Sequence, residues 1–172
     1  ESEAPMNTTS EHAIRTILVG QSGGPTAAIN ASLAGVIRAA HAQGLRVLGM
    51  RNGIQRFLED KVVDLTEALE LTASESEALD QAATNPGEKN LQLLRKTPSS
   101  WLGSCRFKLP DLGTKLTATS ESTVTSPIYQ QIEAQLKKYQ VDAVLYIGGN
   151  DSMDTTDKLS RYFAQVESPV RV

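Results

Sequence analysis

The fold is decided by residues 14–50, which read IRTILVGQSGGPTAAINASLAGVIRAAHAQGLRVLGM. Residues 14–19 are mostly apolar, are rich in β-branched side chains and run into a glycine, which predicts a buried strand. The apolar positions of residues 27–42 recur at helical spacing, and Gly44 ends the predicted helix. Residues 46–50 are again typical of a strand. A strand, a helix and a strand within about 40 residues indicate a βαβ unit, with parallel strands and a right-handed crossover.

The last part of the chain repeats this alternation. The pattern predicts a helix over 127–139, a strand over 143–147 and a helix over 152–163. Residues 169–172 are typical of the start of another strand. We therefore expect an α/β fold: a Rossmann-like, three-layer α/β/α arrangement with a mostly parallel sheet.

The ends and the middle of the chain are less regular. Residues 57–71 indicate short helical or strand pieces, and residues 73–90 are polar without a clear apolar period. Residues 113–126 are rich in Ser and Thr, which is typical of a surface loop. We expect a disordered tail over 1–13 and a single α/β domain over 14–172.

The composition excludes several classes of function. The chain has 172 residues, 40% of them hydrophobic, which suits one domain with a core. A net charge of -3 provides no basic surface for nucleic acid. No apolar run approaches the roughly 20 residues of a membrane helix, and the polar N-terminus does not resemble a signal peptide. A single cysteine, Cys105, fits a reducing compartment. We expect a cytoplasmic protein that binds neither nucleic acid nor membrane.

Two glycine pairs follow predicted strands: Gly23-Gly24 and Gly148-Gly149. Parallel strands bind ligands at their carboxyl ends, where a glycine pair lets the backbone approach a phosphate. Free N–H groups at the start of the next helix add hydrogen bonds and a positive dipole. The alternative is that each pair only forms a tight turn. The first pair fits neither the dinucleotide nor the Walker A pattern, because Pro25 follows Gly24 and no G-K-[ST] occurs.

The polar residues after the second pair fit two interpretations. One of Asn150, Asp151 and Ser152 is expected to cap the following helix. Together with Asp154 they also supply oxygen atoms that suit magnesium beside a phosphate. Arg106 follows a glycine and small residues, so it is either a phosphate ligand or a surface ion-pair arginine.

Residues 20–30, 103–106 and 148–154 resemble, in this order, three motifs of the phosphofructokinase family. They are most similar to the pyrophosphate-dependent branch, the diphosphate–fructose-6-phosphate 1-phosphotransferases. The resemblance extends over residues 14–172 and implies the N-terminal lobe of a phosphofructokinase-like fold. It also implies a glycolytic phosphotransferase that moves a phosphoryl group from pyrophosphate to the 1-hydroxyl of fructose 6-phosphate.

The resemblance also implies roles for individual residues. Donor-binding residues are Gly23, Gly24, Arg106, Gly149, Asp151 and Ser152. Arg106 and Asp151 are implied as catalytic, and Asn150 and Asp151 as ligands of the Mg²⁺ cofactor. The family usually has an aspartate at the position of Asn150. Because a neutral amide is a poorer metal ligand, the metal is expected to depend more on Asp151 or on water as ligands. ATP-using members keep a glycine at the position of Asp151, so its bulk and charge favour pyrophosphate over ATP.

The family's catalytic-base loop and sugar-phosphate lobe are expected beyond Val172, so we expect this chain alone to be inactive. Two alternatives stay open: an ATP-dependent 6-phosphofructokinase, and a non-catalytic phosphate-binding or regulatory subunit. The expected partners are pyrophosphate and fructose 6-phosphate. The resemblance further implies a homo-oligomer, or pairing with the remainder of the enzyme.

Overall fold

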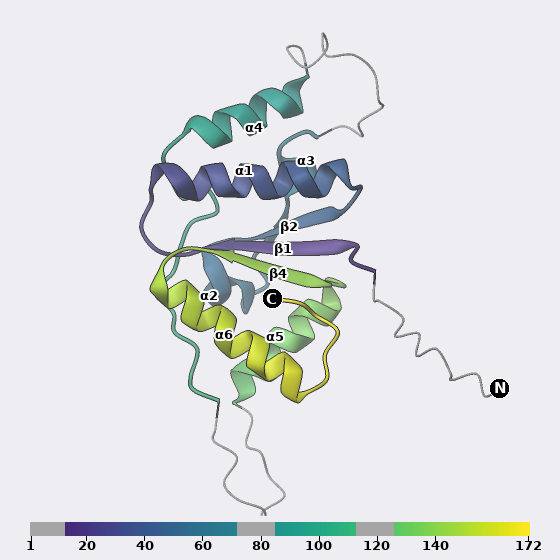
Figure 1. Ribbon diagram of the computed structural model, residues 1–172, viewed down its shortest axis with the longest axis vertical. Coiled ribbons are helices and arrows are strands. Elements are labelled where there is room, and N and C mark those ends of the chain that lie inside the picture. Colours follow the sequence, from purple (N-terminus) through teal and green to yellow (C-terminus); the bar gives the residue numbers. More distant parts are fainter. Residues whose placement is uncertain (1–12, 72–84, 113–125) are drawn as a thin grey trace, which may run out of the picture.

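The computed structural model describes residues 13–71, 85–112 and 126–172 (Figure 1). Its helices and strands are, in chain order, β1 (Thr16–Gln21), α1 (Ala27–Ala42), β2 (Arg46–Met50), α2 (Gly53–Phe57), β3 (Val62–Asp64), α3 (Leu65–Ala68), α4 (Pro86–Lys96), α5 (Pro127–Lys138), β4 (Ala143–Ile147) and α6 (Asn150–Gln165). The expected disordered tail, much of the polar stretch and almost all of the expected loop lie outside the described residues.

The strands form one four-stranded sheet in the order β3-β2-β1-β4. Strand β1 lies in the centre and pairs in parallel with both β2 and β4; Ile17 faces Val47 on one side and Ala143 on the other. Strand β3 pairs antiparallel with β2 at the edge. The predicted parallel βαβ unit over residues 14–50 is therefore confirmed.

Helices cover both faces of the sheet, which confirms the three-layer arrangement. Figure 1 shows α1, α3 and α4 on one side and α2, α5 and α6 on the other. Successive residues of β1 point to opposite faces of the sheet. Leu18 belongs to the core cluster that includes Tyr129 of α5 and Leu159 of α6. Val19 belongs to the second cluster, with Leu33 of α1.

Helix α1 has the predicted bounds because its sequence defines both of its ends. Its apolar residues at helical spacing are buried: Ile29, Leu33, Ile37 and Ala40. Gly44 follows with a φ of +67°, a left-handed conformation that glycine adopts without a steric cost. Strand β2 then begins at Arg46, the predicted residue.

Several boundaries differ from the sequence predictions. Strand β1 begins at Thr16, two residues later than predicted, and α6 begins at Asn150, two residues earlier. Helix α4 was not predicted; it begins at Pro86, inside the polar stretch over 73–90 that has no clear apolar period. Only Gly87, Leu91 and Leu94 of α4 are buried, which is too few for a clear apolar pattern.

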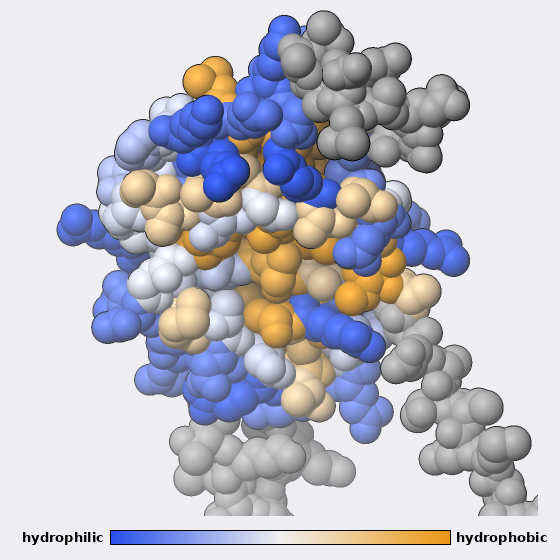
Figure 2. Space-filling view, turned by 45° about the horizontal axis from the view of Figure 1, so that its top comes forward, coloured by the Kyte–Doolittle hydropathy of each residue, from blue (hydrophilic) through white to orange (hydrophobic). Residues whose placement is uncertain are grey.

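The surface of the described residues is mixed in character. Figure 2 shows hydrophobic side chains in the middle of one face, with hydrophilic ones around them. Arg171 forms a single parallel bridge to Ala143 of β4, which agrees with the predicted start of a strand over 169–172. Among the described residues, no helix combines the length and the apolar character needed to cross a membrane.

Candidate functional site

The two glycine turns lie side by side at the carboxyl ends of β1 and β4. The Ser22 N–H donates a hydrogen bond of 2.8 Å to the Ile147 carbonyl. A Cβ built on Gly23 would lie 3.7 Å from the backbone nitrogen of Gly149. The central strands therefore bring together two turns that are far apart in the sequence, at the edge where parallel α/β sheets bind ligands.

The four glycines of these turns have different constraints. Gly23 has a φ of +86°, which a side chain rarely adopts. Gly148 is crowded, since a Cβ there would lie 2.0 Å from the Ser152 Oγ. A Cβ on Gly24 or Gly149 would meet nothing within 4 Å. The backbone at Gly24 and Gly149 is thus open to a ligand, while Gly23 and Gly148 are needed by the turns themselves.

No side chain caps the start of α6. Gly149 occupies the N-cap position, with no side-chain hydrogen bond to the helix. The expectation that Asn150, Asp151 or Ser152 would cap this helix was therefore wrong. The helix begins two residues earlier than predicted, so all three residues lie inside its first turn. Its positive dipole end and Asp151 face the same edge as the glycine turns.

Ser152 differs from the other implied site residues because it is buried. Its exposed fraction is 1%, and its hydroxyl has no hydrogen-bond partner among the described residues. The hydroxyl lies against Gly148, inside the turn. By contrast, Gly23, Gly149 and Asn150 are exposed.

Residues 103–111, here called segment 103–111, run past these turns without regular secondary structure. The Ser22 hydroxyl donates a hydrogen bond of 3.4 Å to the Cys105 carbonyl. Side chains alternate along the segment: Phe107 and Leu109 pack on the core, while Arg106 and Lys108 are exposed. Alternate residues of an extended chain share one side, so both cations face solvent on the same side of the segment.

Two buried polar side chains hold the beginning of segment 103–111. The Gln21 amide oxygen accepts a hydrogen bond of 2.8 Å from the Leu102 N–H. Its amide nitrogen donates to the Asn30 Oδ1 at 3.1 Å. The same Asn30 oxygen accepts a bond of 2.9 Å from the Trp101 N–H. The chain just before segment 103–111 is therefore fixed to β1 and α1.

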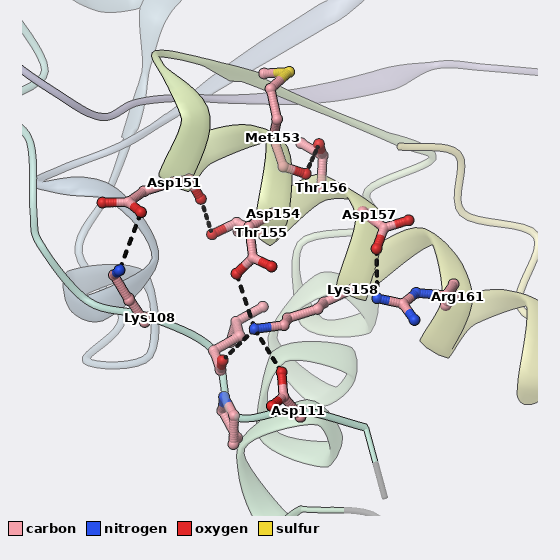
Figure 3. Close-up of polar contacts among 12 residues, drawn as sticks. Lys108, Asp111, Asp151, Met153, Asp154, Thr155, Thr156, Asp157, Lys158 and Arg161 are labelled. Atoms are coloured by element: carbon pink, nitrogen blue, oxygen red, sulfur yellow. Dashed lines mark hydrogen bonds and ion pairs between the residues drawn. The ribbon is translucent and has the colours of Figure 1, made fainter. Parts of the chain in front are cut away.

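Lys158 of α6 holds the other end of the segment. Its ammonium group donates to the Leu109 carbonyl at 3.1 Å and lies 3.0 Å from the Asp111 carboxylate and 2.8 Å from the Asp154 carboxylate (Figure 3). The hydrogen bonds to Asp154 and Asp111 raise the pKa of Lys158. The bond between Lys158 and Asp111 also lowers the pKa of Asp111. Asp154, which was expected near the metal ligands, is thus engaged by Lys158.

Asp151 faces Lys108. Their nearest charged atoms, Nζ and Oδ1, are 3.2 Å apart, and Figure 3 shows the two side chains pointing toward one another. Both side chains are largely exposed, at 69% for Lys108 and 71% for Asp151. An exposed pair of this kind contributes about 0–1 kcal/mol to stability. The contact links segment 103–111 directly to the first turn of α6.

The residues implied as metal ligands fit a magnesium ion that is shared with a phosphate. Among the described residues, no three His, Cys, Asp or Glu side chains are grouped so that they could hold a metal by themselves. Magnesium binds through one or two carboxylates, with phosphate oxygens and water as its other ligands. Asn150 and Asp151 are exposed at the first turn of α6 and supply an amide and a carboxylate oxygen.

Cys105 packs beneath the turns rather than facing solvent as a nucleophile. Its sulfur lies 3.9 Å from the Tyr146 hydroxyl, and both groups adjoin Gly53. Burial raises the pKa of Tyr146 to about 12, so this phenol stays neutral at physiological pH. Cys105 and Tyr146 therefore have a packing role next to the glycine turns.

Sequence reasoning missed Gln21, Asn30, Lys108 and Lys158. One signal was available for Gln21 and Asn30: they are polar residues at otherwise apolar positions, one ending a buried strand and the other on the buried face of α1. Such residues are buried only with hydrogen-bond partners. No local signal marks Lys108, because its partner Asp151 is distant in sequence. One signal was available for Lys158, since Asp154 lies four residues earlier, at the spacing of an ion pair within a helix.

Replacing Gln21 by leucine is expected to lower both stability and ligand binding. The buried Leu102 N–H would be left without its acceptor, at a cost of about 1–3 kcal/mol. The Asn30 Oδ1 would keep the Trp101 N–H as its donor. Thermal unfolding with and without pyrophosphate measures both effects. Gln130→Leu, at an exposed position of α5, is the control. An unchanged melting temperature for Gln21→Leu would contradict the proposed anchoring.

Comparison with known proteins identifies the family of this chain. The phosphofructokinase family profile matches residues 16–170. The pyrophosphate–fructose 6-phosphate 1-phosphotransferase of Xanthomonas campestris is 37% identical over 145 residues, covering 84% of this chain and 28% of that protein. The ATP-dependent 6-phosphofructokinase of Glaesserella parasuis is 30% identical, covering 81% of this chain and 33% of its own length.

The solved structures give the same result. The crystal structure of the pyrophosphate-dependent phosphofructokinase from Nitrosospira multiformis superposes with a TM-score of 0.65 and 30% identity, covering 92% of this chain and 32% of that one. The fold is thus an α/β architecture shared with phosphofructokinases. The chain belongs to the phosphofructokinase family. It spans between 28% and 33% of the length of the relatives named here.

Proposed function

We propose that residues 14–172 form the phosphoryl-donor side of a pyrophosphate-dependent 6-phosphofructokinase. The complete reaction would transfer a phosphoryl group from pyrophosphate to the 1-hydroxyl of fructose 6-phosphate. The observation that carries the choice of donor is Asp151, an exposed carboxylate in the first turn of α6 beside the open glycine turn. The similar proteins from Xanthomonas and Nitrosospira are named as pyrophosphate-using enzymes, which supports the same donor.

Each implied residue has a role in this proposal. The backbone N–H groups of Gly23, Gly24 and Gly149 donate hydrogen bonds to the oxygen atoms of pyrophosphate. The positive end of the α6 dipole attracts the same oxygen atoms. The guanidinium of Arg106 binds the phosphoryl group that is transferred. Ser152 supports the turn from inside.

Asp151 and Asn150 would hold Mg²⁺ together with donor oxygens. When bound, the ion neutralises phosphate charge. The remaining contribution of this chain is positioning and electrostatic stabilisation, which dominate phosphoryl transfer.

In the proposed transfer, the bond between phosphorus and the bridging oxygen of pyrophosphate breaks. A bond from that phosphorus to the sugar oxygen forms, and phosphate leaves. The sugar hydroxyl gives its proton to a base, a role that we assign to none of the described residues. The proposal for this chain therefore concerns the donor and not the acceptor.

Removing the charge of Asp151 is expected to shift donor preference toward ATP. A carboxylate at this position repels the additional phosphate of ATP. Pyrophosphate has only two phosphates, so it has no group at this position to be repelled. Asp151→Gly should change the ratio of the two affinities by about tenfold, or about 1.4 kcal/mol, in favour of ATP. Isothermal titration calorimetry of the chain with the magnesium complexes of pyrophosphate and ATP measures this ratio.

Asp151→Asn separates charge from size, because it keeps the volume and removes only the charge. A shift in both variants indicates repulsion, and a shift in Asp151→Gly alone indicates lack of space. If the wild-type chain binds ATP as tightly as pyrophosphate and neither variant changes the ratio, the ATP-dependent alternative is the correct one.

A non-catalytic phosphate-binding subunit is the second candidate, and Asn150 favours it. A neutral amide is a poorer magnesium ligand than the carboxylate that the family usually has there. Titration of pyrophosphate with and without Mg²⁺ separates the two candidates. A donor site should bind at least about tenfold more tightly with the metal, whereas a simple phosphate-binding subunit should show no such dependence.

A further inference from the structure

We propose that Lys108 is a second cation for the donor phosphates, and that Asp151 holds it at the site before the donor binds. This inference rests on the proposed function, since it adds a residue to the same site. On donor binding, Lys108 would exchange the Asp151 carboxylate for a phosphate oxygen. Asp151 would be released toward the metal.

The first support is the alternation of side chains along segment 103–111. Phe107 and Leu109 pack on the core, which leaves Arg106 and Lys108 exposed on the opposite side. Arg106 is itself implied as a phosphate ligand, so Lys108 shares the orientation of a residue that the proposed function assigns to the donor. No ion-pair partner of Arg106 occurs among the described residues.

The second support is that the backbone of the segment is held at both ends. Gln21 fixes Leu102 through a hydrogen bond of 2.8 Å, and Lys158 fixes Leu109 through one of 3.1 Å. The backbone at Lys108 is therefore already fixed, and only the lysine side chain has to move when the donor binds. Little backbone entropy is then lost when the ammonium group binds a ligand, and the cost is confined to the lysine side chain.

The third support is the charge balance of the groups involved. The Lys108–Asp151 pair, at 3.2 Å, is exposed and hence weak, so its exchange costs little. A pyrophosphate carries several negative charges and attracts an ammonium group more strongly than a single carboxylate does. Asp111 and Asp154, the other carboxylates nearby, are engaged by Lys158 and do not compete for Lys108.

The test uses two variants that break the same ion pair, Lys108→Ala and Asp151→Asn, titrated with pyrophosphate in the absence of metal. We expect Lys108→Ala to weaken binding about tenfold, because a phosphate contact is lost. We expect Asp151→Asn to tighten binding about threefold, because a repelling charge is lost and Lys108 is released. A purely structural role of the ion pair would move both variants in the same direction.

Two further variants complete the design. Lys108→Arg keeps the charge and should stay within about threefold of the wild type. Lys89→Ala removes an exposed lysine of α4, on the far side of α1, and should leave binding unchanged. Thermal melts check that all variants fold.

The outcomes separate the two proposals. If wild-type chain binds no pyrophosphate with or without Mg²⁺, the proposed function fails and the role of Lys108 fails with it. If the wild type binds and Lys108→Ala binds equally well, only the role of Lys108 is overturned. The same holds if both pair-breaking variants weaken binding alike.

Discussion

Arg106→Ala is expected to weaken pyrophosphate binding by about 10- to 100-fold, the largest effect of any single side chain at the site. A hydrogen bond to a charged group contributes about 1.5–3 kcal/mol, and a guanidinium offers two of them in one plane. Arg106 is exposed, and its backbone is tied through Cys105 to the Ser22 hydroxyl at the end of β1. Its loss should therefore reduce affinity without reducing stability.

Arg106→Lys distinguishes charge from geometry at this position. Lysine keeps the charge but not the planar pair of donors, so we expect it to recover only part of the lost affinity. Arg95→Ala, an exposed arginine in the last turn of α4, is the matched control. Calorimetric titration with magnesium pyrophosphate gives the affinities. Wild-type affinity in Arg106→Ala would remove Arg106 from the site.

Gly148→Ala is expected to have the largest effect on stability. A Cβ at this position would lie 2.0 Å from the Ser152 Oγ and 2.6 Å from the Ser22 carbonyl oxygen. Relief of the second contact requires movement of the backbone between β1 and β4. Overpacking of this kind costs about 1–3 kcal/mol or more, and we expect a fall in melting temperature of about 5–10 °C.

Gly149→Ala is the matched control for this substitution. It is the neighbouring glycine of the same turn, and a Cβ there would meet nothing within 4 Å. It should melt close to the wild type. Adding Ser152→Ala to Gly148→Ala should restore part of the lost stability, because it removes only the contact with the hydroxyl. Equal melting temperatures for the two single glycine variants would contradict the crowding at Gly148.

The sequence predicted those parts of the fold that depend on local patterns. Helix α1 was placed correctly because its apolar residues recur at helical spacing and Gly44 supplies a left-handed stop. Helix α4 was missed because it buries only one narrow side, at Leu91 and Leu94. Capping at α6 was predicted wrongly, since Gly149 occupies the N-cap position without a side chain.

The site was predictable where its residues lie next to strand ends. Both glycine turns could be placed at one edge of the sheet from the order of strands and helices alone. The roles of Arg106 and Asp151 as ligands remain predictions. The hydrogen bond from the Leu102 N–H to the Gln21 side chain joins residues that are 81 positions apart, and it depends on tertiary packing, as does the contact between Lys108 and Asp151. No local pattern in the sequence could predict them.

Segment 103–111 has a consequence for how this protein folds. Leu102, just before it, packs in the cluster under α1, whereas Leu109 packs in the cluster under α5 and α6. The segment thus passes from one hydrophobic core to the other around the ends of the strands. Its anchoring contacts join residues 81 and 49 positions apart, and contacts of such long range form late because the chain must first close large loops. Neither core can complete the ligand-binding edge alone, so this edge is expected to become ordered only at the final cooperative step of folding.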